Sequence, residues 1–233
     1  MEITQTIAAK VLQTVDSGLV SGVGKPIPGE MCVEAAVCYA LDLPHGDEPG
    51  CVNRALRAFK IRLNDAHWSS PAARAAGLRR LALAQLGSAG HLDDREFTRR
   101  LAELTIRVAV PIALRAAASI QKDPKHKEAL LDHAATCERE GTRQVALDAK
   151  NADAANAANA ADAAYAADAA ADAAAYAADA AAYAADAAAY AAAYAADAAR
   201  DKVLSDFAEA VVQLLISMGA PGCQWLGLAP LAA

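Results

Sequence analysis

The side chains best suited to chemistry gather in one early stretch, MCVEAAVCYALDLPHGDEPGCV. Zinc prefers nitrogen and sulfur ligands, so Cys32, His45 and Cys51 are weak candidates for a metal site, although their spacing matches no familiar zinc module. A cysteine nucleophile with His45 as its base is a second possibility. Packing of buried thiols is the third, and we favour it because free cysteine is among the most buried residue types. We therefore expect no metal and no cofactor.

A second candidate site lies in the basic part of the chain. Residues 51–120 carry 12 Lys and Arg against 5 Asp and Glu. An anion or nucleotide pocket could draw on Arg79, Arg80, Arg99 and Arg100. The alternatives are a solvated basic face, or a surface that attracts the acidic part of the same chain.

That acidic part is an Ala-rich tract with a regular stripe of Tyr and Asp. Residues 151–199 contain seven Asp and neither Lys nor Arg. Steps of three and four residues put the Tyr and Asp side chains on one helical face and leave only Ala opposite. Tyr offers a large contact area at low entropic cost. The candidate partner-binding residues are Tyr176, Asp179, Tyr183, Asp186 and Tyr190. A layer packed within the domain is the favoured alternative, and a disordered spacer is the third.

Helices must position these residues, because no segment shows the strict alternation of a half-buried strand. Apolar spacing predicts helices over residues 3–19, 31–41 and 52–63. Ser69 or Ser70 followed by Pro71 predicts another helix start. The fold class expected is all-α, a multi-helix bundle or array with long Ala-rich helices packed on a basic helical domain.

Two further helices are expected before the Ala-rich tract. One begins at Asp93 or Asp94, and Pro111 should kink it or split it in two. The other opens at Pro124. No Gly or Pro occurs between Gly141 and Gly219. One rod of that length would be far longer than a compact domain, so the tract should break.

These features predict three segments. Residues 1–141 form a helical domain, residues 142–218 an Ala/Tyr/Asp-rich helical segment that packs on it, and residues 219–233 a C-terminal tail. All three are expected to form one integrated domain.

Composition limits the function classes. The net charge of −6 argues against general nucleic-acid binding. The five Cys are widely spaced without a CxxC pair, which favours reduced thiols in a cytoplasm. The N-terminal MEITQTIAAK contains no apolar run and predicts no signal peptide. We expect a soluble, cytoplasmic protein without a membrane span.

The stretch GKPIPGEMCVEAAVCYALDLPHGDEPGCV resembles a group of bacterial proteins without an assigned activity, of the kind found in planctomycetes. The resemblance extends through KIRLNDAHWSS, GLRRLALAQLGSAG, RLAELTIR and MGAPGCQWLGL. Their Ala/Tyr/Asp-rich stretch lies at the same place. In composition, the Ala/Tyr-rich helices are also similar to predicted bacterial immunity proteins of the Imm5-like kind. Neither resemblance implies a catalytic residue.

Two functions are expected from these observations. The first is a non-enzymatic cytoplasmic interaction protein, an immunity or regulatory factor, that binds a protein partner through the Tyr/Asp stripe. The alternative is a binder of a small ligand such as a nucleotide or anion, or an enzyme, that uses the Cys32–Cys51 segment and nearby arginines.

Overall fold

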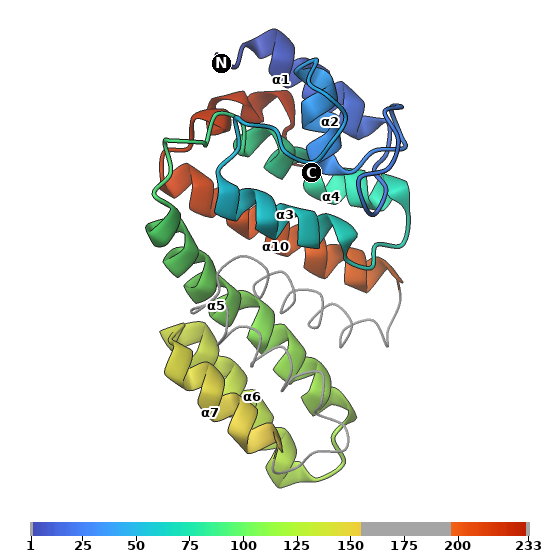
Figure 1. The fold of residues 1–233 in the computed structure, drawn as a ribbon. Coiled ribbons are helices and arrows are strands. Elements are labelled where there is room, and N and C mark those ends of the chain that lie inside the picture. Colours follow the sequence, from blue (N-terminus) through green and yellow to red (C-terminus); the bar gives the residue numbers. More distant parts are fainter. Residues whose placement is uncertain (1, 155–196, 232–233) are drawn as a thin grey trace. The chain divides into compact units, whose positions relative to one another are not determined.

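A computed structural model describes residues 2–154 and 197–231 (Figure 1). Within those ranges the regular elements are all helices, which confirms the all-α prediction. The order along the chain is α1 (Gln5–Asp16), α2 (Val33–Ala40), α3 (Arg54–Asp65), α4 (Pro71–Ala84), α5 (Asp94–Ile120), α6 (Pro124–Glu140), α7 (Arg143–Ala154), α10 (Asp197–Ser217) and the 3-10 helix η1 (Pro221–Leu228).

The chain divides into two compact units that differ from the three predicted segments. Unit 1 consists of Met1–Phe97 and Ala208–Ala233, and unit 2 of Thr98–Phe207. The C-terminal residues, expected as a tail, belong to unit 1 and contain η1. The Ala-rich tract, with its predicted break and its predicted packing on the basic helices, lies mostly outside the described residues.

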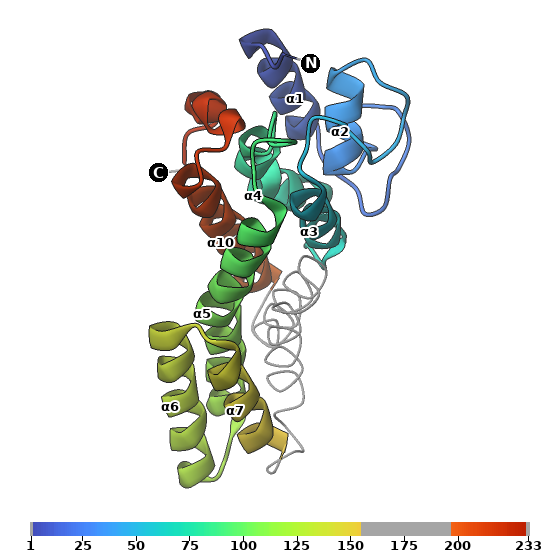
Figure 2. The same cartoon turned by 60° about the vertical axis from the view of Figure 1, so that its left-hand side comes forward.

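In unit 1, α4 packs against α1, α2 and η1, and α1 also packs against α2 (Figure 2). Its core is aliphatic, and Leu78, Leu81 and Leu83 of α4 are fully buried. The helix begins as its sequence predicts. Ser70 is the N-cap and its hydroxyl accepts a hydrogen bond from the Ala73 N–H, while Pro71 occupies the first turn.

Buried polar side chains fix the long loop between α1 and α2. The amide of Asn64 accepts from the Val33 N–H at 3.2 Å and donates to the Val20 carbonyl at 2.9 Å. The Arg74 guanidinium donates to the Leu19 carbonyl at 3.0 Å and to the Asn64 carbonyl at 2.7 Å. Because these bonds satisfy loop groups that would otherwise be buried unpaired, they hold the loop on α3 and α4.

The backbone of η1 approaches the end of α4 very closely at Gly222. A Cβ at this buried glycine would lie 2.7 Å from the Ala84 oxygen and 2.7 Å from the Leu86 nitrogen. Arg80 of α4 adds a polar anchor, since its guanidinium donates to the Ala229 carbonyl at 2.6 Å and pairs with Glu209 at 2.8 Å. Helix η1 is therefore an integral part of unit 1.

In unit 2, α6 and α7 lie side by side, and an apolar cluster joins them to α5 (Figures 1 and 2). Arg107 caps the C-terminus of α6, where its guanidinium donates to the carbonyl oxygens of Glu138, Arg139 and Glu140. A cation at this end also complements the helix dipole. Gly141 ends the helix in the left-handed conformation.

Helix α5 continues through Pro111, so of the two outcomes predicted there the split is wrong, and the kink stays a prediction. The neighbouring Val110, Ala113 and Leu114 are fully buried. Their packing offsets the backbone hydrogen bond that proline cannot make. Asp93 accepts from the Glu96 N–H at 2.7 Å, as expected of the residue that begins this helix.

No helix in the described ranges combines the length and apolar character needed to cross a membrane. All five cysteines are free thiols.

We expect Gly222→Ala to lower the free energy of unfolding by about 1–3 kcal/mol, because the added methyl group collides with backbone atoms of α4. Gly227→Ala is the matched control in the same 3-10 helix, since a Cβ there meets no atom within 4 Å. Denaturant unfolding followed by tryptophan fluorescence would measure both. Equal stability of the two variants would contradict the close approach of η1 to α4.

Candidate functional site

The predicted partner-binding residues Tyr176, Asp179, Tyr183, Asp186 and Tyr190 lie outside the described residues. Their role stays a prediction.

The arginines proposed for an anion site already interact with other groups. Arg79 pairs with Asp16 through two hydrogen bonds of 3.1 and 2.9 Å. Arg80 forms an ion pair with Glu209. The guanidinium of Arg99 lies 3.6 Å from the Glu103 carboxylate. Arg79 and Arg80 belong to unit 1, whereas Arg99 and Arg100 belong to unit 2. An anion site formed by these residues stays a prediction.

The three weak zinc candidates take different local roles. The Cys32 thiol caps α2 by accepting from the Ala35 N–H at 3.3 Å, and Nε2 of His45 lies 3.0 Å from the Gly24 carbonyl oxygen. Cys51 lines a pocket. Among the described residues, no three His, Cys, Asp or Glu side chains are grouped to hold a metal ion.

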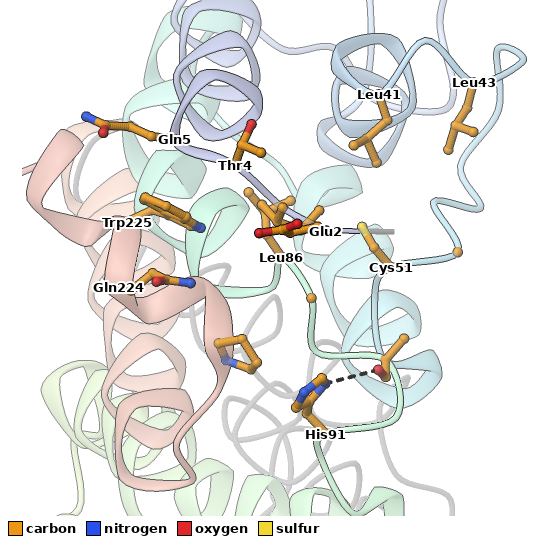
Figure 3. Close-up of a pocket in the computed structure, with 15 residues that line it drawn as sticks. Glu2, Thr4, Gln5, Leu41, Leu43, Cys51, Leu86, His91, Gln224 and Trp225 are labelled. Carbon is orange, nitrogen blue, oxygen red and sulfur yellow. Dashed lines mark hydrogen bonds between the residues drawn. The ribbon is translucent and has the colours of Figure 1, made fainter.

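The pocket that contains Cys51 is the strongest candidate site in unit 1 (Figure 3). Its volume is about 880 Å³. Four separate stretches of the chain build it, namely residues 2–5 before and at the start of α1, residues 41–51, residues 86–91 and residues 221–225 of η1. Docking of η1 on α4 is thus what closes one side of the pocket.

Apolar walls and a few polar groups make up the lining. Leu41, Leu43 and Leu86 supply aliphatic surface, while His91 and Trp225 are its aromatic residues. Nδ1 of His91 lies 3.4 Å from the Ala89 carbonyl oxygen. The remaining polar side chains are Glu2, Thr4, Gln5, Cys51 and Gln224, and none of the described residues that line the pocket is a Lys or Arg.

One donor in this lining has no acceptor. The indole nitrogen Nε1 of Trp225 is shielded from solvent and makes no hydrogen bond. Figure 3 shows this nitrogen at the end of the ring directed toward the side of the pocket where Leu86 and Glu2 lie. A buried donor without a partner costs about 1–3 kcal/mol, and because this nitrogen has no accessible surface, the ring of Trp225 rather than its N–H faces the pocket.

Cys51 is poorly suited to act as a nucleophile. Burial raises the pKa of its thiol, although the Gly87 backbone N–H and the nearby Lys60 ammonium oppose part of that effect. Burial also raises the pKa of Cys38 to about 11 and that of Cys32 above its usual range. Because the thiolate is the reactive form, these environments disfavour attack on a substrate.

Behind Cys51 lies a fully buried ion pair between α2 and α3. Nζ of Lys60 is 3.2 Å from Oε1 of Glu34, and both side chains have no exposed surface. Within the described part of the chain, neither side chain makes a hydrogen bond of regular geometry. Burial raises the pKa of Glu34 and lowers that of Lys60, while the attraction between the two charges opposes both shifts.

The Cys32–Cys51 segment, predicted to take part in a small-ligand site, supplies Leu41, Leu43, Gly50 and Cys51 to the pocket, but sequence reasoning missed its other three walls. The sequence predicts only a tail for Gln224 and Trp225, and only the start of a helix for the N-terminal residues. A usable signal was the short PGCQWLGL stretch, because a Trp flanked by Gly and Pro in a terminal segment needs a surface to pack on.

Compared with known proteins, the chain matches no family model, no curated protein sequence and no solved structure.

We expect Glu34→Leu and Lys60→Met, each made alone, to destabilise unit 1 by about 3–5 kcal/mol, since each leaves an uncompensated buried charge. The double variant should return to within about 1 kcal/mol of the wild type, because two apolar side chains of similar volume need no partner. Intrinsic fluorescence reports this unit, as Trp68 and Trp225 both belong to it. If the double variant loses the sum of the stability lost in the two single variants, Glu34 and Lys60 do not interact as a buried charge pair.

Proposed function

We propose that this chain is a binding protein for small organic molecules and that its ligand site is the pocket between the start of α1, residues 41–51, residues 86–91 and η1. The observation that carries the proposal is the pocket itself, which has a volume of about 880 Å³ and a lining that combines the aliphatic side chains of Leu41, Leu43 and Leu86 with a few polar side chains. The proposal also places the protein in the cytoplasm, where its free thiols would stay reduced.

The dimensions of the pocket support this assignment. Small-molecule sites have volumes of roughly 300–1,000 Å³ and are mostly apolar, with a few polar groups that orient the ligand. The pocket has a volume of about 880 Å³. Leucine side chains and the ring of Trp225 provide apolar contact area, and Gln224 and Gln5 provide polar atoms for orientation.

Binding is better supported than catalysis by the residues around the pocket. A nucleophilic mechanism needs an activated thiol, but burial raises the pKa of Cys51. The Glu34 and Lys60 side chains, which could supply acid and base chemistry, have no exposed surface through which to reach a substrate.

A steric variant tests the site without straining the fold. Gly50 lines the pocket, its φ is not positive, and a Cβ added there meets no atom within 4 Å. Gly50→Phe should therefore fill the pocket and weaken binding of the neutral probe N-phenyl-1-naphthylamine by about tenfold or more. Probe fluorescence during a titration gives the dissociation constant.

Gly46→Phe is the matched control, because Gly46 lies in the same loop with equally open space but does not line the pocket. It should bind the probe like the wild type. If the wild type does not bind the probe, or if both variants bind it equally well, the pocket is not the ligand site.

A further inference from the structure

The segment that leaves α2 has an unusual backbone conformation next to the pocket. Asp42 has a φ of +55°, and among the described residues it is the one non-glycine residue whose φ is positive. A Cβ makes the left-handed region unfavourable, although aspartate tolerates it better than most residue types. Backbone strain of this kind persists only where the surroundings hold it, and such positions cluster at binding sites.

The left-handed residue ends α2 in a Schellman motif. The Leu43 N–H donates to the Cys38 carbonyl at 3.0 Å, and the Asp42 N–H donates to the Tyr39 carbonyl at 3.2 Å. These two bonds satisfy carbonyl groups of the last helical turn and direct the chain away from the helix axis. Glycine is the usual residue at the left-handed position of this motif, so an aspartate there calls for a reason.

The Asp42 side chain adds a tether that glycine could not supply. Its carboxylate accepts from Nζ of Lys10 at 2.7 Å, which joins the end of α2 to α1. The same ammonium lies 5.8 Å from the centre of the Tyr39 ring, within the range of a cation–π contact. Because both of these contacts are made to the end of α2, they favour the left-handed turn over other conformations of the loop.

The turn determines which way the two neighbours of Asp42 face. Leu41 and Leu43 both line the pocket, and in Figure 3 their side chains point from this segment toward it. If α2 continued as a helix, the two leucines would lie about 200° apart around its axis, because successive residues are rotated by about 100°. The turn at Asp42 instead brings both side chains to one wall. Each leucine is half-buried and keeps surface that a ligand can cover.

We propose that Asp42 is a positioning residue of the pocket, an inference that rests on the function proposed above. Its left-handed backbone presents Leu41 and Leu43 together as one apolar wall, and the Lys10 contact keeps this wall in place before a ligand arrives. A preformed wall needs no ordering on binding, which lowers the entropic cost of association. Asp42 itself does not line the pocket, so it acts through the two leucines.

Substitutions at position 42 test the turn directly. Asp42→Val should weaken binding of N-phenyl-1-naphthylamine by about tenfold or more, because a β-branched side chain strongly disfavours the left-handed conformation. Asp42→Gly adopts this conformation without strain and should bind the probe within about twofold of the wild type. Asp42→Asn should do the same, since asparagine tolerates the left-handed region and its amide oxygen can still accept from Lys10.

Gly22→Val controls for a general loss of stability. Gly22 also belongs to unit 1 and has a φ of +68°, a Cβ there meets no atom within 4 Å, and the residue does not line the pocket. This variant should lower the thermal stability much as Asp42→Val does, yet leave the dissociation constant of the probe unchanged. If Asp42→Val does not fold, Asp42→Ala applies the same strain more mildly and should weaken binding about fivefold.

The outcomes separate this inference from the proposed function. Normal binding by Asp42→Val, or a glycine variant that binds as weakly as the valine variant, would overturn the positioning role of the turn. If Gly50→Phe blocks the probe in either case, the pocket remains a ligand site whose wall does not depend on Asp42. A wild-type protein that does not bind the probe would overturn both.

Discussion

Unit 1 depends on the close backbone approach between η1 and the end of α4. Only glycine fits at position 222, because any side chain would overlap the carbonyl and amide groups of residues 83–86. Arg80 strengthens the same junction by binding both Glu209 and the Ala229 carbonyl. Gln224 and Trp225 follow shortly after Gly222 in η1. This contact therefore determines where these two lining residues of the pocket lie.

The buried Glu34–Lys60 pair imposes a second constraint on the same unit. Two charges without solvent contact or additional hydrogen bonds are a net cost relative to apolar side chains of equal volume. Their mutual attraction nevertheless specifies how α2 faces α3, because any other register would leave each charge alone. Lys60 lies close enough to Cys51 to lower the pKa of its thiol. The ion pair is therefore near the pocket, but neither of its side chains is exposed there.

Much of the helical organisation could be predicted from local sequence. Pro71 after two serines and Pro124 predict two helix starts, and in the structure Ser70 and Asp123 cap these helices. The pocket could not be predicted in this way. Its walls come from four stretches far apart in the chain, and local spacing does not reveal which loops meet.

Proximity in sequence does not bring the weak zinc candidates together. Cys32, His45 and Cys51 are close along the chain, but α2 and its following loop give them separate partners: the Ala35 N–H, the Gly24 carbonyl and the pocket wall. At Pro111 the residue type predicted a kink or a split, and the buried neighbours on α5 keep the helix continuous.

The indole N–H groups allow the most direct test of the account. The chain has two tryptophans, and Nε1 of Trp68 already donates to the Leu63 carbonyl at 2.9 Å. A ¹⁵N-labelled sample should therefore give two indole cross-peaks, of which one is an internal reference. Titration with N-phenyl-1-naphthylamine should shift the Trp225 cross-peak, because Trp225 lines the pocket, and leave that of Trp68 in place. An unchanged Trp225 cross-peak at saturating ligand would contradict a binding site at this pocket.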